Sequence, residues 1–455
     1  MTLRSINPAS DQLIRDYAEL DADELDTLSA AASAAVPAWS ALHVASRAEI
    51  FYRASELLEQ RSDVLAILMA QEMGKPVHDG HAEVEKCAWV CRYYAENAER
   101  FLRTEPIESD ASRSKIAFRP LGCVLGIMPW NFPLWQAFRF LAPTLMAGNT
   151  ALLKHASNVS GCALAIESVL QDAGLPRAVF RALLINSERV ADVIAHPAIS
   201  AVSLTGSTAA GKSVAATAGK HLKKCVLELG GSDAYLILDD ADVQNAAVVC
   251  ATSRLINAGQ SCISAKRFIV VQSRAEEFTE LFVQAMRSRQ FGDPLIAATE
   301  LGPLARRDLR DALHQQVLAS VDAGARLLCG GQIPDRPGAW YPPTVLSEVK
   351  PHMPAWDEEL FGPVASVITA MDETDAVRIA NATDYGLGAA VFTRDIERGE
   401  RLAEGALHAG SCFVNTLVKS DPRLPFGGIK HSGYGRELGL FGIREFVNVK
   451  TVYVA

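Results

Sequence analysis

The chain has 455 residues, enough for two or three domains with well-buried cores. Apolar residues make up 49% of it and charged residues 21%, as in folded globular proteins and unlike disordered or fibrous ones. The net charge of -9, from 44 basic and 53 acidic residues, argues against nucleic acid as the main partner, because phosphate binding favours a basic surface.

The start of the chain, MTLRSINPASDQLIRDY, lacks the apolar core of a signal peptide. The most apolar stretch, CVLGIMPWNFPLW at 123–135, is interrupted by glycine, proline and asparagine, so no membrane span is expected. Nine scattered cysteines form neither a disulfide framework nor a zinc pattern, so most are expected to be reduced core residues and no metal site is expected. These features together predict a cytoplasmic protein.

Residues 41–103 are expected to be helical, because apolar residues recur at intervals of three and four on either side of a break at Gly74, Lys75 and Pro76. After 104, strand-like runs such as TALLK, AVSLTG, AYLIL and RFIVV alternate with helical segments of crossover length. This rhythm indicates parallel βαβ units and a doubly wound α/β domain. It resumes after 231 through ASVITA and SCFVN, which predicts a second α/β domain.

Residues 206–213, GSTAAGKS, match the phosphate-loop pattern G-x-x-x-x-G-K-[ST] after a strand-like segment. YLILDD at 235–240 resembles a strand that ends in a magnesium-binding aspartate. A P-loop ATPase is therefore an open alternative. By itself the segment indicates only a glycine turn at a helix N-terminus, whose N–H groups favour any phosphate, including the pyrophosphate of a dinucleotide.

Three short motifs carry residues suited to catalysis. In PWNFP, two prolines fix the backbone around Asn131, whose amide is then a rigid donor for an oxyanion; a turn amide is the structural alternative. In VLELGG, Glu228 stands between two leucines, where lost solvation raises its pKa toward that of a general base; a strand glutamate is the alternative. In GQSC, Cys262 lies among small polar residues, a setting for a reactive thiol.

These motifs, in this order, resemble the aldehyde dehydrogenase superfamily, and the resemblance continues through EELFGP at 358–363 and PFGGIKHSGYGRELG at 425–439. It implies that Cys262 attacks an aldehyde as a thiolate, that Asn131 and the Cys262 backbone stabilise the oxyanion, and that a nicotinamide takes up hydride. Glu228 then activates water to hydrolyse the thioester, and its presence argues against acyl transfer to coenzyme A. An ordinary thiol is only about 3% ionised at pH 7, so activation is required.

The resemblance also implies the cofactor contacts. Lys154 is in the position that meets the adenosine ribose, and Ser157 stands where many members have a glutamate. A serine leaves room for a 2′-phosphate that a glutamate would repel, so NADP is favoured and NAD stays possible; helix capping explains Ser157 equally well. The other implied contacts are Gly206 and Ser207 at the pyrophosphate, Glu359 and Phe361 at the nicotinamide ribose and ring, and the backbone of Trp130 and Leu229.

The substrate is suggested by Arg139, which lies eight residues after Asn131 in a predicted helix and can share the face that lines the substrate path. Its guanidinium suits an aldehyde with a distal carboxylate, which it can bind bidentately; a helix-surface ion pair is the alternative. The segment is most similar to bacterial members that oxidise succinate semialdehyde. By that resemblance, Ser261 and Ser420 bind the carboxylate and Trp135 lines the tunnel.

Glutarate semialdehyde and aliphatic or aromatic aldehydes remain alternative substrates, because Ser232 and Asp233 depart from the family pattern after ELGG. The expected architecture is an NAD(P)-binding domain of residues 1–103 and 122–230 and a catalytic domain of residues 231–420. A small β oligomerisation element, of residues 104–121 and 421–455, ends in a strand that needs an edge to pair with. The family implies a homodimer or homotetramer. A catalytically silent nucleotide-binding scaffold is a further alternative.

Overall fold

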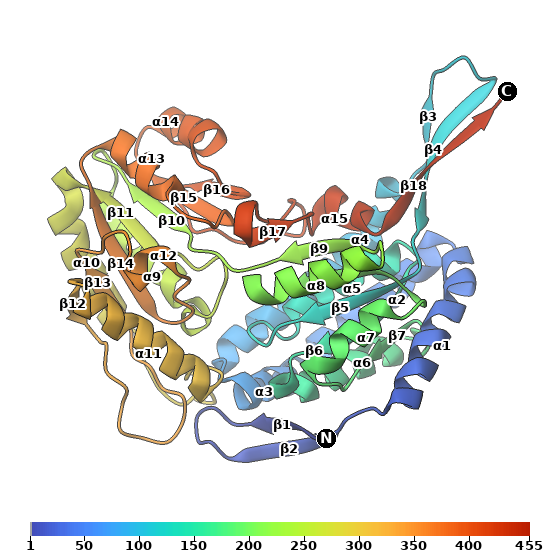
Figure 1. Ribbon diagram of the computed structural model, residues 1–455, viewed down its shortest axis with the longest axis horizontal. Helices are drawn as coiled ribbons and strands as arrows, with labels where there is room; N and C mark the ends of the chain where they lie inside the picture. The colour runs from blue at the N-terminus through green and yellow to red at the C-terminus, as the bar shows by residue number, and fades with distance from the viewer. Residues whose placement is uncertain (1) are drawn as a thin grey trace.

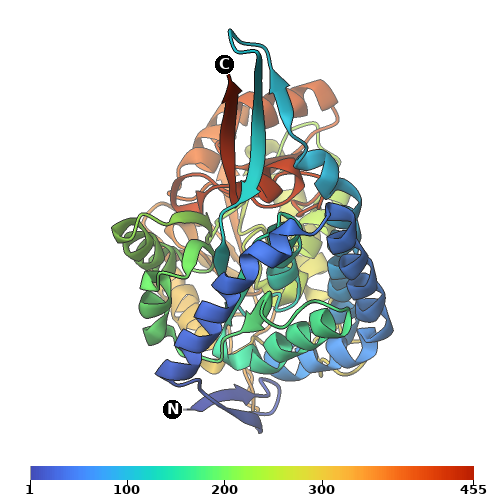
Figure 2. The same cartoon turned by 90° about the vertical axis from the view of Figure 1, so that its right-hand side faces the viewer.

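Two sheets of mostly parallel strands, each covered by helices on both faces, make up most of the computed structural model, which describes residues 2–455 (Figure 1). An antiparallel arm projects from one end, and a hairpin lies at the N-terminus (Figure 2). The two doubly wound domains predicted from the strand rhythm are confirmed.

The first sheet has the strand order β17-β9-β8-β5-β6-β7, parallel except for β17. Successive residues of its central strands face opposite cores: Val124 and Leu153 pack on one side, Leu125 and Leu152 on the other. Both faces are buried, which explains why these strands are apolar throughout. The strands are β5 (Cys123–Met128), β6 (Thr150–His155), β7 (Phe180–Ala182), β8 (Ile199–Thr205), β9 (Lys224–Glu228) and β17 (Gly433–Tyr434).

The helices of this domain divide between its two cores. On one face lie α2 (Val44–Gln60), α3 (Ser62–Met73), α4 (Val77–Phe101), α5 (Trp135–Met146) and α6 (Ser160–Asp172), and on the other α1 (Ala22–Ala41), α7 (Val190–Ala195) and α8 (Thr208–Lys220). The helices predicted within 41–103 are confirmed. Gly74 ends α3 in the left-handed conformation (φ 79°), and a side chain there would also overlap Pro303.

The second sheet has the order β12-β13-β14-β11-β10-β15-β16, with only β12 antiparallel. Its strands are β10 (Ala234–Ile237), β11 (Arg267–Val271), β12 (Arg326–Cys329), β13 (Thr344–Ser347), β14 (Val364–Ala370), β15 (Gly388–Phe392) and β16 (Ser411–Val414). One face packs on α9 (Val243–Leu255) and α10 (Ala275–Arg287), and the other on α11 (Arg307–Asp322), α12 (Pro354–Asp357) and α13 (Glu373–Asn381). The short α14 (Ile396–Arg401) lies beside β16.

The arm consists of β3 (Glu105–Ile107), β4 (Arg113–Pro120) and β18 (Val447–Val454). The edge that the terminal strand was expected to need is supplied within the same chain, because β18 pairs with β4 along its whole length. The expected extent of the oligomerisation element needs correction. Residues 433–434 pair with β9 in the first sheet, and α15 (Gly439–Glu445) buries Ile443 in the first domain. Such long-range pairing leaves no local sequence signal.

The N-terminal hairpin pairs β1 (Thr2–Ile6) with β2 (Leu13–Ala18), and Ser5 Oγ donates to the carbonyl of Asn158 at 3.1 Å. Within residues 2–455 no single helix combines the length and apolarity needed to cross a bilayer, and only the pair α1 and α2, bent by 113°, satisfies both criteria together. All nine cysteines are unpaired, and five of them are fully buried.

Candidate active site

The loop that presents Cys262 is built on an unusual backbone. Asn257, Ala258 and Gly259 are consecutive left-handed residues, with φ of 53°, 53° and 75°. Such conformations persist only where the surroundings hold them. Here Asn257 Nδ2 donates to the Asn131 carbonyl at 2.6 Å, and Gln260 Oε1 accepts from the Ala305 N–H at 2.8 Å. The loop is therefore held against the PWNFP segment.

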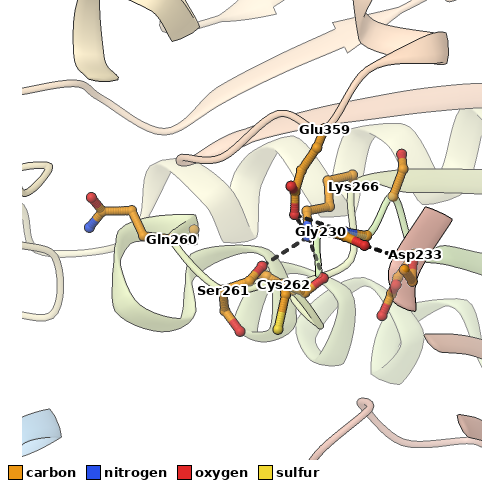
Figure 3. A network of polar contacts seen from close by, with 12 residues as sticks. Gly230, Asp233, Gln260, Ser261, Cys262, Lys266 and Glu359 are labelled. Atoms are coloured by element: carbon orange, nitrogen blue, oxygen red, sulfur yellow. Dashed lines mark hydrogen bonds and ion pairs between the residues drawn. The ribbon is translucent and has the colours of Figure 1, made fainter. Parts of the chain in front are cut away.

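Lys266 holds the same loop through its ammonium group (Figure 3). Its Nζ donates to the carbonyls of Ser261 and Cys262 at 2.9 and 2.6 Å and lies 3.5 Å from the Glu359 carboxylate. Glu359 also accepts from the Gly231 N–H at 3.0 Å, and any side chain at Gly230 would overlap its carboxylate. The network ties the Cys262 loop to Glu359. The sequence alone indicated no role for Lys266.

Cys262 lies at the boundary of two cavities. The first cavity, of about 220 Å³, is lined by Cys262 together with Lys75, Lys86, Trp135, Arg139, Ser261 and Ser420, among others. The second cavity, of about 260 Å³, is lined by Cys262 together with Trp130, Asn131, Gly206, Ser207, Leu229, Glu359 and Phe361, among others. A third cavity of about 490 Å³ shares Thr205 and Gly206 with the second and extends to Lys154. A thiol at this boundary is accessible from both sides.

Asn131 is buried beside Cys262. Its Nδ2 donates one of its two hydrogens to the Gln260 carbonyl at 2.9 Å, and the other hydrogen is left to donate. The Cys262 N–H likewise has no hydrogen-bond acceptor in the described part of the chain. An oxyanion formed on a carbon bound to Cys262 needs such donors, so the geometry suits the role expected of Asn131.

The Asn131 segment is fixed at its other end by Glu83. Its Oε1 accepts from the N–H groups of Leu134 and Trp135, both at 2.9 Å, where α5 begins. Lys75 forms a buried ion pair with the same carboxylate. A carboxylate at a helix N-terminus is stabilised by the free N–H groups and the helix dipole. Glu83 therefore holds the start of α5.

Burial raises the pKa of the Cys262 thiol to about 12, and the nearby Lys266 and Arg139 only partly oppose this rise. The thiol is therefore protonated at neutral pH. The activation that an ordinary thiol already needs is larger here, because the proton must be removed from a desolvated sulfur. A base is required.

Glu228, at the end of β9, is the base that the sequence predicts. Burial, and secondly the neighbouring Glu437, raise its pKa well above the ordinary value, in the direction expected from its leucine neighbours. Neither carboxylate oxygen has a partner within residues 2–455. The side chain packs against Gly427 and lines neither cavity beside Cys262. A rotamer change is needed to bring it to the reacting atoms.

The expected cofactor residues lie at three different cavities. Six of them line the second cavity. There Ser207 Oγ caps α8 by accepting from the Ala210 N–H at 3.2 Å, and the ring centres of Trp130 and Phe361 are 5.8 Å apart. Lys154 is buried at the third cavity. Ser157 is exposed on a neighbouring cavity, and its side chain caps neither the turn it begins nor α6. The helix-capping explanation of Ser157 is therefore wrong.

The phosphate-loop alternative fails on the topology. The strand before GSTAAGKS, β8, lies in the first sheet, whereas β10, which leads to Asp240, lies in the second. Asp240 accepts from Thr393 Oγ1 at 2.8 Å and pairs with Arg398 at 3.2 Å, both in the second domain. Lys212 is exposed on α8. The three parts of a magnesium-nucleoside triphosphate site are therefore not assembled.

Asp233, which departs from the family pattern, is buried at the second sheet. Its Oδ1 accepts from the Gly388 N–H at 3.0 Å, and burial raises its pKa to about 6, with Lys266 opposing that rise. Asp233 joins β15 to the start of β10. Asp233 therefore links two strands of the second sheet, and it lines neither cavity beside Cys262.

Arg139 lines the first cavity but is already occupied. It forms a buried ion pair with Glu437, donates from Nη2 to Thr205 Oγ1 at 3.1 Å, and lies 4.9 Å from the centre of the Phe426 ring. The alternative of a helix-surface ion pair is wrong because the pair is buried. Glu437 and Thr205 use only part of the guanidinium fork, so the binding of a substrate carboxylate by Arg139 stays a prediction. Trp135, Ser261 and Ser420 do line this cavity.

Sequence reasoning missed Lys86, on α4. Its Nζ donates to Ser420 Oγ at 2.7 Å and lies 4.3 Å from the centre of the Trp135 ring. A signal was present: Asp79, Glu83 and Lys86 recur at i, i+4 and i+7, one face of a helix whose neighbouring positions are apolar. A charged stripe on a packed face indicates a polar cavity.

Comparison with known proteins settles the family. The model of the aldehyde dehydrogenase family matches residues 1–452. The chain belongs to this family. It is 47% identical over 455 residues to a probable NADP-dependent succinate-semialdehyde dehydrogenase of Synechocystis sp., with 100% of both chains covered. It is 44% identical over 449 residues to the NAD(P)-dependent succinate semialdehyde dehydrogenase Sad of Escherichia coli, covering 99% and 97% of the two chains.

A crystal structure of succinic semialdehyde dehydrogenase from Streptococcus pyogenes in complex with NADP+ superposes with a TM-score of 0.97 at 36% identity, over 99% of each chain. The resemblance inferred from PWNFP, VLELGG and GQSC is confirmed. The protein is accordingly an NAD(P)-dependent oxidoreductase of aldehydes.

A dinucleotide fits the residues of this aldehyde dehydrogenase. The second and third cavities share Thr205 and Gly206, so together they extend from Cys262 past the N-terminus of α8 to Lys154. That N-terminus and the Gly206 turn favour a pyrophosphate. The absence of a side chain at Gly230 leaves the Glu359 carboxylate in the second cavity. An elongated anionic group is thus accommodated on one side of Cys262, opposite the first cavity.

Proposed function

We propose that this aldehyde dehydrogenase oxidises succinate semialdehyde to succinate, with NADP as the preferred cofactor and NAD as a second one. The observation that carries the proposal is the first cavity, where Cys262 shares the wall with Arg139, Lys86 and Ser420. At about 220 Å³ it is smaller than the pockets of about 300–1,000 Å³ that hold drug-sized ligands. A short aldehyde with an anionic end fits this size and charge. The activities after which the relatives are named agree with this proposal.

Catalysis begins when Cys262 passes its proton to a base, Glu228 or a water molecule, and the thiolate attacks the aldehyde carbon. A carbon–sulfur bond forms as the carbonyl π electrons move to oxygen. The resulting oxyanion accepts hydrogen bonds from Asn131 Nδ2 and the Cys262 N–H. These donors are fixed in advance, Asn131 through its backbone contact with Asn257, so little reorganisation is needed as the charge develops. A nicotinamide cofactor held by the residues of the second cavity would supply the hydride acceptor that this carbon needs in order to become a thioester.

Glu228 completes the turnover by removing a proton from the water that attacks the thioester. Its raised pKa suits a general base near neutral pH. Rotation from its position beside Gly427 brings the carboxylate to the second cavity. Attack of hydroxide on the thioester carbon breaks the carbon–sulfur bond, so succinate leaves and the Cys262 sulfur is free again.

The cofactor preference is assigned to Lys154 and Ser157. Lys154 supplies positive charge at the third cavity, and the exposed Ser157, three residues later, lacks the carboxylate that would repel a 2′-phosphate. The other contacts in this proposal are Gly206 and Ser207 with the pyrophosphate, Glu359 and Phe361 with the nicotinamide riboside, and the backbone of Trp130 and Leu229.

The domains take separate roles in this proposal. Residues 1–103 and 122–230 bind the cofactor, residues 231–420 carry Cys262, and the arm of β3, β4 and β18 joins copies of the chain into a homodimer or homotetramer. Exposed apolar side chains on the arm, Ile107, Val449 and Tyr453, support assembly there. Nine unpaired cysteines support a reducing, cytoplasmic location.

The test is a comparison of kcat/KM for succinate semialdehyde with NADP and with NAD, following reduced cofactor and identifying succinate by chromatography. Glutarate semialdehyde, pentanal and benzaldehyde serve as competing substrates. We expect succinate semialdehyde with NADP to give the highest value. A higher kcat/KM for any of the other aldehydes would contradict the assigned substrate, and a higher value with NAD would contradict the assigned cofactor.

A further inference from the structure

The turn that carries Asn131 is bridged by one imidazole ring, that of His155. Residues 129–133 lead from β5 toward α5, and His155 is the last residue of β6, where it pairs with Met128 in the first sheet. Its Nε2 lies 2.8 Å from the Pro133 carbonyl oxygen, and its Nδ1 lies 3.1 Å from the Met128 carbonyl oxygen. The ring therefore contacts the residue before the turn and the last residue of the turn.

The His155 ring is buried and neutral. Burial lowers its pKa to about 4, although the two carbonyls oppose this change. A neutral imidazole has one N–H donor and one acceptor nitrogen. Nδ1 accepts from the Ala156 N–H at 3.0 Å, so we assign the hydrogen to Nε2. The hydrogen bond that the ring donates is therefore the one to the Pro133 carbonyl.

The position of the Pro133 carbonyl depends on this bond. Within residues 2–455 no backbone N–H donates to it, whereas the Met128 carbonyl accepts from the Ala156 N–H at 3.0 Å. Pro133 is buried, and a buried carbonyl without a donor is unfavourable. The ring of Pro133 also fixes its own φ and restricts Phe132 before it, so a displaced carbonyl would shift Asn131 as well.

The other contacts of the turn come from other parts of the molecule. Asn257, on the Cys262 loop, donates to the Asn131 carbonyl, and Glu83, on α4, accepts from the N–H groups at the start of α5. His155 adds a contact with the end of a central strand of the first sheet. A donor for an oxyanion must hold its place as the charge develops, so an anchor on a buried strand suits this purpose.

We propose that His155 is a positioning residue for the oxyanion donor: its Nε2–H fixes the Pro133 carbonyl and, through the turn, the Asn131 amide. The inference rests on the proposed role of Asn131 but not on which aldehyde is the substrate. The His155 ring lines none of the three cavities described around Cys262. It therefore acts through Asn131 and not by contact with the reacting atoms.

The experiment compares wild type with His155→Gln, whose amide nitrogen reaches the position of Nε2, and with His155→Met, which has the same length but no donor. His155→Asn, whose amide reaches only the position of Nδ1, is a second variant without a donor for Pro133, and it decides the test if His155→Met does not fold. His314→Met is the matched control, because this half-buried histidine bonds to Tyr341 in the second domain.

Two reactions are followed for each protein: oxidation of pentanal, and release of nitrophenolate from para-nitrophenyl acetate. In the second reaction the Cys262 thiolate adds to the ester carbon and forms an oxyanion without any cofactor. The carbon–oxygen bond then breaks, nitrophenolate leaves, and the acetyl group stays on sulfur. Cofactor affinity is measured by fluorescence titration, and folding is checked by the melting temperature.

We expect His155→Met and His155→Asn to slow both reactions by about 10- to 50-fold, mainly through kcat, as for partial loss of one oxyanion donor. His155→Gln should stay within about threefold of wild type, His314→Met should match wild type, and cofactor affinity should change less than about threefold throughout. When Asn131→Ala is already present, adding His155→Met should have almost no further effect, because the donor that His155 positions is gone.

Full rates in the variants without a donor, equal losses in His155→Gln and His155→Met, or losses that multiply with that of Asn131→Ala would overturn the assignment. A loss of cofactor affinity as large as the loss of rate would overturn it too, because His155 would then support the cofactor cavity. Failure of the proposed mechanism looks different: unchanged rates in Asn131→Ala alone would remove the oxyanion role of Asn131, and the inference with it.

Discussion

The two cavities that meet at Cys262 are built in different ways. The second cavity is formed largely by continuous segments: the turn between β8 and α8, the residues that follow Glu228, and the Asn131 segment. The first cavity draws its polar side chains from α4, α5 and the loop after β16, which are far apart in the chain. A cavity formed by continuous turns can be recognised from short sequence motifs. A cavity formed by side chains from distant helices leaves no such motif in the sequence.

The comparison also separates general chemistry from selectivity. Residues shared by both sides, Cys262 above all, act on the aldehyde group of any substrate. Residues confined to the first cavity, such as Lys86, contact only what distinguishes one aldehyde from another. Substitutions should therefore fall into classes according to the cavity they affect, and the predictions below run from the largest expected effect to the smallest.

Replacement of Cys262 by alanine should abolish turnover of every aldehyde, whatever group the substrate places in the first cavity. We expect kcat to fall by at least about 10³-fold, because the carbon–sulfur bond cannot form. Cofactor binding, measured by fluorescence titration, should persist. Cys412→Ala, at another half-buried cysteine, is the control and should keep full activity. Substantial turnover in Cys262→Ala would rule out the thiolate mechanism.

Replacement of Glu228 by glutamine should lower steady-state kcat by about 10²–10⁴-fold, because thioester hydrolysis loses its base. Rapid mixing should still show a burst of reduced cofactor if another group deprotonates Cys262. Loss of the burst would assign deprotonation of the thiol to Glu228 as well. An unchanged kcat would contradict its role in hydrolysis.

Ser157→Glu tests the adenosine end of the cofactor side. A carboxylate at this position repels the 2′-phosphate. The repulsion energy between two unit charges 4 Å apart near a protein surface is about 4 kcal/mol before screening by salt. We therefore expect kcat/KM for NADP to fall by about 10- to 100-fold. The value for NAD should change little, and Ser157→Ala should be milder. Equal effects on the two cofactors would show that Ser157 does not face the 2′ position.

The pH dependence of the ratio of kcat/KM values, succinate semialdehyde over pentanal, isolates the first cavity, since titration of Cys262 and Glu228 affects both substrates. Burial, and secondly Arg139, lower the pKa of Lys86 to about 8, while Glu83 and Asp421 oppose them. A protonated Lys86 on the cavity wall attracts a carboxylate, so the ratio should be highest well below pH 8 and decline as the pH rises through 8.

Besides Arg139, the other charged side chains that line this cavity are Asp79 and the exposed Lys419, together with Lys75 and Glu83, which form an ion pair with each other. Lys86→Arg should move the decline in the substrate ratio to higher pH, because a guanidinium keeps its proton. A decline at the same pH in that variant would assign the titration to one of these other groups.

Lys212→Ala should have the smallest effect, within about twofold in kcat/KM for either cofactor, because this exposed helix lysine lies outside the cavities beside Cys262. The same change in a P-loop enzyme removes a phosphate contact. A loss of tenfold or more would show that the GSTAAGKS segment holds phosphate through Lys212 after all.

The amino-acid sequence by itself determined the alternating α/β architecture and the residues nearest the chemistry. Apolar β-branched runs, helical periodicity and glycine breaks act locally, so they are visible in the chain. PWNFP, VLELGG, GSTAAG and GQSC are likewise continuous, because backbone turns must be made by neighbouring residues. The tertiary structure decided what depends on distant segments: the pairing of β18 with β4, the ion pair of Arg139 with Glu437, and the hydrogen bond of Lys86 to Ser420. A side chain's partner depends on which elements pack together, and that is set by the fold as a whole.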